Sequence, residues 1–121
     1  MIIEVLRGRT GIRAVVAALR GAGTPIYCTA ISWAEVHAGL RAGEEPMTDR
    51  VFEGLGEVVL DGRAGRQAGR YLARFAGSHA LKIADALIAA AAATTGLHLW
   101  TLHRRDYPME DVHFFEPSLK G

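Results

Sequence analysis

The sequence predicts an α/β fold in which a central parallel sheet lies between two layers of helices. Stretches with helical spacing of apolar residues alternate with short, continuously apolar stretches along the whole chain. Continuously apolar strands that are separated by helices are typical of a parallel sheet covered on both faces. The 121 residues contain no linker, repeat or low-complexity tract. We therefore expect a single domain over residues 1–121.

The expected elements follow directly from these patterns. Helices are expected around the apolar stripes at residues 2–6, 12–19, 33–40, 51–55, 68–75 and 83–95. Strands are expected at residues 26–29, 58–60, 97–101 and 112–115. The first helical pattern begins at Met1 with no strand before it, so the first strand of such a sheet is expected to be missing.

Residues at the ends of these stretches support the assignments. Gly and Pro within residues 21–25 end the second stripe, and Gly43 follows the third. Asp61 can cap the helix that carries the 68–75 stripe. Gly96 ends the alanine-rich helix.

Composition excludes several classes of protein. Half of the residues are apolar, yet the longest apolar run, residues 86–93, is much shorter than the roughly 20 residues that a membrane helix needs. A basic segment followed by a long apolar stretch does not open the chain, so we expect no secretory signal and no membrane partner. The single cysteine, Cys28, excludes an intrachain disulfide and fits a reducing compartment. These observations predict a cytoplasmic protein.

The net charge of +1 does not by itself point to nucleic acid. Arginine nevertheless supplies most of the positive charge, in groups at residues 7–20, 63–74 and 104–105. Arginine favours phosphate or carboxylate partners. A GC-rich genome explains the same excess, because alanine is abundant as well.

Carboxylates at the ends of elements are the remaining candidates for chemistry. The sequence has no phosphate-binding P-loop, no dinucleotide glycine fingerprint and no paired cysteines for zinc. Cys28 lies in an apolar strand, where packing is a more common role than catalysis.

Glu35 and Asp85 each have a structural and a functional interpretation. Ser32 and Glu35 have the spacing of a capping box, which would make Glu35 a helix-start residue. Asp85 lies near a helix start, where the helix dipole favours negative charge. Its neighbours three and four positions away are largely apolar, however, and a buried carboxylate is costly unless it is paired. A Mg²⁺ ion would offset that cost.

A third cluster follows the strand at residues 97–101. Thr101, His103, Arg104 and Asp106 would lie at the carboxyl edge of the sheet, where open α/β folds bind ligands. Asp106 can equally be a helix cap or an ion-pair partner of Arg104 or Arg105. His103 has the alternative of an ordinary solvated loop residue.

Together these clusters resemble the PIN-domain family, and within it the VapC-type toxins of toxin–antitoxin systems. The resemblance spans nearly the whole chain and consists of four motifs in order: Ile3-x-x-Leu6-Arg7-Gly8, Ser32-x-x-Glu35 with Gly39-Leu40, Asp85-Ala86-Leu87-Ile88-Ala89-Ala90, and Thr101-x-His103-x-x-Asp106-Tyr107.

The resemblance implies an endoribonuclease that depends on Mg²⁺ or Mn²⁺, with a three-layer α/β/α fold. It assigns metal binding to Glu35 and Asp85, and catalysis to these two with Asp106. Thr101, His103 and Arg104 would support the substrate or the site. The implied partners are an RNA substrate, a cognate VapB-like antitoxin and a second copy of the chain, with helices between Thr10 and Arg41 as possible dimer contacts.

Two positions depart from the family pattern. His103 stands where an acidic residue or Asn is common, so Asp106 is the nearest replacement for the fourth carboxylate. The family's first Asp would fall two residues before Met1, which implies a start assigned too late or a truncated paralogue. Glu4 is not expected to substitute, because it lies within a helical pattern. The alternatives are a catalytically degenerate PIN-like domain that serves as a protein-binding or dimerisation module, and an unrelated small α/β binding domain.

Overall fold

In a computed structural model of the chain, residues 2–3, 25–79, 81–101 and 104–115 are described. Their elements, in chain order, are β1 (Ile2–Ile3), β2 (Tyr27–Cys28), α2 (Ala30–Ala38), α3 (Glu45–Glu53), β3 (Gly56–Glu57), α4 (Gly62–His79), α5 (Ile83–Thr95), β4 (Leu99–Trp100) and the 3₁₀ helix η1 (Arg104–Asp106). The apolar stripe at residues 12–19 lies outside the described residues.

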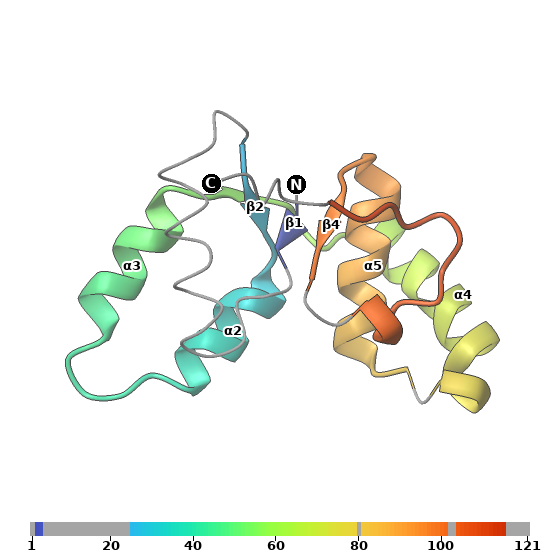
Figure 1. The fold of residues 1–121 in the computed structure, drawn as a ribbon, viewed down its shortest axis with the longest axis horizontal. Helices are drawn as coiled ribbons and strands as arrows, with labels where there is room; N and C mark the ends of the chain where they lie inside the picture. The colour runs from blue at the N-terminus through green and yellow to red at the C-terminus, as the bar shows by residue number, and fades with distance from the viewer. Residues whose placement is uncertain (1, 4–24, 80, 102–103, 116–121) are drawn as a thin grey trace.

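The strands form a parallel sheet with the order β3-β2-β1-β4. Figure 1 shows α2 and α3 on one side of the strands and α4 and α5 on the other. The three-layer α/β/α architecture with a central parallel sheet is therefore confirmed. The crossovers from β2 to β3 and from β3 to β4 pass through helices, as parallel pairing requires.

The expectation that the first strand is missing is wrong. Ile2–Ile3 is a strand, β1, and it lies in the middle of the sheet between β2 and β4. β-Branched isoleucines favour strands, and a central position offers hydrogen-bond partners on both sides. Helical spacing over five residues is too weak to compete with those partners.

This correction removes the reason for excluding Glu4. The register pairs Ile3 with Trp100, so Glu4 follows β1 in the sequence as Thr101 follows β4. The placement of Glu4 itself lies outside the described residues.

The other strands form close to the expected positions but are shorter. β3 lies at Gly56–Glu57 instead of residues 58–60, and the Tyr27 ring lies against Gly56. A Cβ atom at Gly56 would lie 2.4 Å from Cδ1 of Tyr27. Val58 and Leu60 pack against the core beyond the strand. The expected strand at 112–115 is reduced to a bridge between Leu99 and Phe114.

Three expected helix boundaries agree with the structure and one does not. Asp61 caps α4, since its Oδ1 accepts a hydrogen bond from the Ala64 amide at 3.0 Å. Helix α5 spans Ile83–Thr95, and Gly96 ends it with a left-handed φ of 72°. Helix α2 ends at Gly39, before the expected Gly43.

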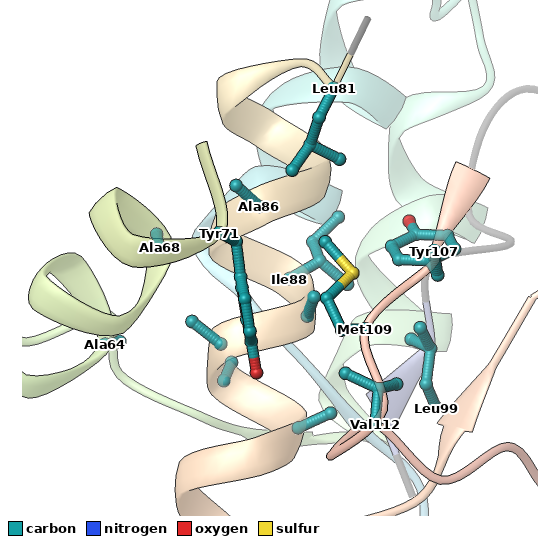
Figure 2. Packing of buried hydrophobic residues seen from close by; sticks show 14 residues of the cluster. Ala64, Ala68, Tyr71, Leu81, Ala86, Ile88, Leu99, Tyr107, Met109 and Val112 are labelled. Atoms are coloured by element: carbon teal, nitrogen blue, oxygen red, sulfur yellow. The ribbon is translucent and has the colours of Figure 1, made fainter. Parts of the chain in front are cut away.

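The core is built around α5, whose alanine-rich segment is almost completely buried. Figure 2 shows Ala64, Ala68 and Tyr71 of α4 on one side of α5. Leu99, Tyr107, Met109 and Val112 lie on its other side. Small side chains let helices approach closely, so α5 is held between α4 and the end of the sheet.

Among the described residues, no helix is both long enough and apolar enough to span a lipid bilayer.

Two glycines are predicted to respond to alanine substitution in opposite directions. Gly69 lies in the middle of α4 with its surface exposed, and a Cβ atom at this position would have open space around it. Gly69→Ala should therefore stabilise the fold by about 0.5–1 kcal/mol. Gly96→Ala should destabilise it by about 1 kcal/mol, because the left-handed conformation disfavours a Cβ. Urea unfolding of both variants measures these changes, and shifts in the same direction would contradict the helix assignment.

Candidate active site

Several of the candidate residues belong to segments that begin at or near the carboxyl edge of the sheet. Helix α2 follows β2 directly, and Thr101 follows β4. Helix α5 leads into β4 through the turn at Gly96, so its first turn, which holds Asp85, lies toward the carboxyl end of β4 (Figure 1). Parallel strands bring residues from distant parts of the chain to this edge.

Asp85 is the one charged side chain among the buried residues of the described chain, with 5% of its surface exposed. The hydroxyl of Tyr107 lies 3.5 Å from its Oδ1, at the outer limit of a hydrogen bond. Burying a carboxylate is costly unless polar partners or a cation offset the lost hydration. A favourable interaction with the helix dipole at the protein surface therefore does not by itself account for Asp85.

Tyr107 is a site residue to which the sequence assigned no role. Its ring packs edge-on to Phe114, with 6.5 Å between ring centres. Its amide donates to the Arg104 carbonyl at 3.0 Å, which closes η1 and directs the side chain inward. The contact with Asp85 joins residues that are 22 positions apart, and no local pattern indicates it.

Glu35 is half-buried in the second turn of α2. The capping-box interpretation is wrong, because Thr29 and not Ser32 is the N-cap. The Oγ1 of Thr29 accepts a hydrogen bond from the Ile31 amide at 3.2 Å. Ser32 is a buried residue inside the helix, so the start of α2 does not need Glu35.

The third cluster is divided between core and surface. Thr101 is buried at 7% exposure. Arg104 and Asp106 are exposed, and the Arg104 guanidinium lies 5.0 Å from the centre of the Phe114 ring. Between these described residues, Asp106 forms no ion pair with Arg104 or Arg105. The structure thus brings Tyr107 against Asp85. His103 lies outside the described residues.

The carboxylates suit Mg²⁺ in type but not in number. Oxygen ligands are what Mg²⁺ prefers, usually a few carboxylates with waters. Within the described ranges, however, no group of three acidic, His or Cys side chains could hold a metal ion. Asp85 and Glu35 therefore do not make a complete metal centre with other described residues.

Cys28 is unsuited to nucleophilic chemistry, as expected. It is buried at 1% exposure. Burial raises the pKa of its thiol from 9.0 to about 11, against a smaller lowering by a hydrogen bond with Trp33. The reactive thiolate is therefore scarce at neutral pH.

Comparison with known proteins gives the class of protein. The family model of the PIN domain matches residues 1–107, so the chain belongs to the PIN-domain family. Among solved structures, it is similar to a toxin–antitoxin complex from Klebsiella pneumoniae, with a TM-score of 0.70 and 20% identity over 92% of this chain and 93% of that one. It is also similar to FitAcB from Neisseria gonorrhoeae, with a TM-score of 0.66 and 22% identity over 96% and 97% of the two chains. No curated protein sequence matches it significantly.

The buried thiol predicts slow alkylation of the folded protein. At pH 9, Cys28 should react with iodoacetamide at least about tenfold more slowly in the folded chain than in urea, because burial both shields the thiol and disfavours thiolate. Mass spectrometry of timed samples measures the two rates. Equal rates would show that β2 and α2 do not enclose Cys28.

Proposed function

We propose that this PIN-domain protein is a metal-dependent endoribonuclease toxin of the VapC type, neutralised by a cognate antitoxin. The observation that carries the proposal is the buried Asp85 at the carboxyl edge of the sheet, in a chain of a nuclease family. Burying a carboxylate costs free energy, and a bound metal ion would offset that cost.

Each candidate has a distinct part in the proposed reaction. Asp85 and Glu35 would bind Mg²⁺ or Mn²⁺, and the Tyr107 hydroxyl would keep Asp85 in one orientation. When bound, such a metal activates water and stabilises the charge that develops on the phosphate. Thr101, His103 and Arg104 would support the RNA at the end of β4, and Arg104 would do so through its exposed guanidinium.

The ligand set needs at least one carboxylate beyond Asp85 and Glu35. Asp106 is one candidate, as the sequence pattern implied. Glu4 is the other, because it follows the central strand β1 in the sequence. A set completed by Glu4 would hold the metal with a longer and less rigid side chain than an aspartate offers.

An antitoxin and a second copy of the chain are the proposed protein partners. One of the two similar solved structures is titled as a toxin–antitoxin complex, and this supports an antitoxin for this chain. The alternative function is a degenerate PIN-like domain that only binds protein or dimerises. The presence of His103, where the family commonly has an acidic residue or Asn, favours that alternative.

Asp85→Asn should lower RNA cleavage at least about a hundredfold, because a neutral amide is a poor metal ligand. Initial rates are measured with Mg²⁺ or Mn²⁺ on antitoxin-free protein, and EDTA should abolish them. Glu53→Gln, an exposed change at the end of α3, is the matched control and should cut at the original rate. Undiminished cleavage by Asp85→Asn would exclude this site, and no cleavage of any RNA class by the original chain would favour the degenerate domain.

Glu4→Gln and Asp106→Asn separate the two candidates for the additional carboxylate. We expect Glu4→Gln to lower cleavage at least about tenfold, because residues that follow central strands meet at the carboxyl edge. Asp106→Asn should have a smaller effect, because the Asp106 side chain is exposed. The ratio of the two rates under the same metal concentration decides between them. A larger loss with Asp106→Asn would restore Asp106 to the metal set.

A further inference from the structure

Helix α4 carries a row of positive charge that the cleavage site does not use. Its 18 residues include four arginines and no acidic residue. Arg63, Arg66, Arg70 and Arg74 recur at intervals of three and four, which places them along one flank of the helix. We call these four residues the arginine flank. From first to last it extends about 16 Å along the helix axis.

Most of the arginine flank is free of counter-charge. All four side chains are exposed. Arg74 lies 3.8 Å from Glu110 in an ion pair open to solvent. Within the described part of the chain, Arg63, Arg66 and Arg70 make no ion pair, and Arg70 donates only to the Oε1 of Gln67 at 2.9 Å. Like charges in a row repel one another, so the fold itself gains nothing from this arrangement.

A hollow of about 450 Å³ lies beside the arginine flank. Arg63, Arg66 and Arg70 line it from α4, together with Thr94 of α5 and Asp111. Both carboxylate oxygens of Asp111 already accept hydrogen bonds. Its Oδ1 accepts from the Tyr71 hydroxyl at 2.8 Å, and its Oδ2 accepts from the Gln67 side-chain amide at 3.3 Å. The three guanidinium groups outweigh this one carboxylate, so the hollow favours an anion.

The character of this surface favours phosphates over a protein partner. Protein interfaces depend on buried aromatic or aliphatic anchors. The large exposed apolar side chains of the described residues are Trp33, Met47, Val59 and Ile83, none of which lies on α4. Exposed positions between the arginines are small, including Gly65 and Gly69. A regular line of guanidinium groups without apolar anchors matches a sugar–phosphate backbone.

We propose that the arginine flank and its hollow form a second RNA-binding surface, which holds substrate phosphates away from the carboxylates. This inference rests on the proposed ribonuclease function. Thr94 lies nine residues after Asp85 on α5, about 13 Å along the helix. The surface therefore binds RNA outside the site of cleavage and raises affinity without taking part in the reaction.

Binding of a labelled oligouridylate, followed by fluorescence anisotropy in EDTA, tests this surface without cleavage. The double variant Arg66→Gln with Arg70→Gln should bind about tenfold more weakly, and its slope of log affinity against log salt should fall by about 1.4, since each lost phosphate contact to a single strand removes about 0.7. The control, Arg41→Gln with Arg50→Gln, removes the same charge from exposed positions outside α4, and its affinity should change less than about threefold.

Several outcomes separate this surface from the proposed function. In cleavage assays the α4 double variant should raise KM and leave kcat unchanged, whereas Asp85→Asn should lower kcat and still bind RNA. If the original chain cleaves RNA but the α4 double variant binds RNA as tightly as the original chain, the surface alone is overturned. Arginine-dependent binding without any cleavage supports the surface and overturns the nuclease. Equal weakening by both double variants, or loss of antitoxin binding with unchanged RNA binding, overturns the surface as an RNA site.

Discussion

The burial of α5 is the constraint on which the rest of this structure depends. The helix is almost all alanine where it meets α4, and its side chains fill the space between α4 and the sheet. Helix α5 must therefore run close to β4, with Asp85 in its first turn toward the carboxyl edge. A larger residue in this segment would separate the layers, and Asp85 would lose its contact with Tyr107. Core packing and the candidate chemistry are thus coupled in one element.

Two kinds of polar group sit on opposite parts of this framework. At the carboxyl edge, the buried carboxylate of Asp85 lies 3.5 Å from the Tyr107 hydroxyl. Along α4, exposed guanidinium groups surround a hollow in which Asp111 is bonded by Tyr71 and Gln67. Burial and the negative charge of Asp111 raise the pKa of Tyr71 to about 12, so this link stays intact well above neutral pH. The carboxylate in the first region is buried, whereas the guanidinium groups in the second are exposed.

Much of the fold and part of the site could be predicted from local sequence. The period of apolar residues predicted α5 with its boundaries, and Asp61 and Gly96 marked helix ends because capping depends on neighbouring backbone alone. The position of Asp85 in a largely apolar helix predicted that its carboxylate is buried. Thr101 was likewise expected as the last residue of a strand; β4 ends one residue earlier, at Trp100, and Thr101 follows it directly.

Only the tertiary structure decided the features that depend on partners distant in sequence. Ile2–Ile3 is a strand because β2 and β4 flank it, although its spacing resembles a helix. The N-cap of α2 is Thr29 and not Ser32, because the preceding strand ends earlier in the chain than a cap at Ser32 would require. The sequence by itself determined which residues are apolar, charged or able to cap. The contact between Tyr107 and Asp85, and the hollow beside the arginine flank, required the packed layers, because each joins segments that meet only after the chain has folded.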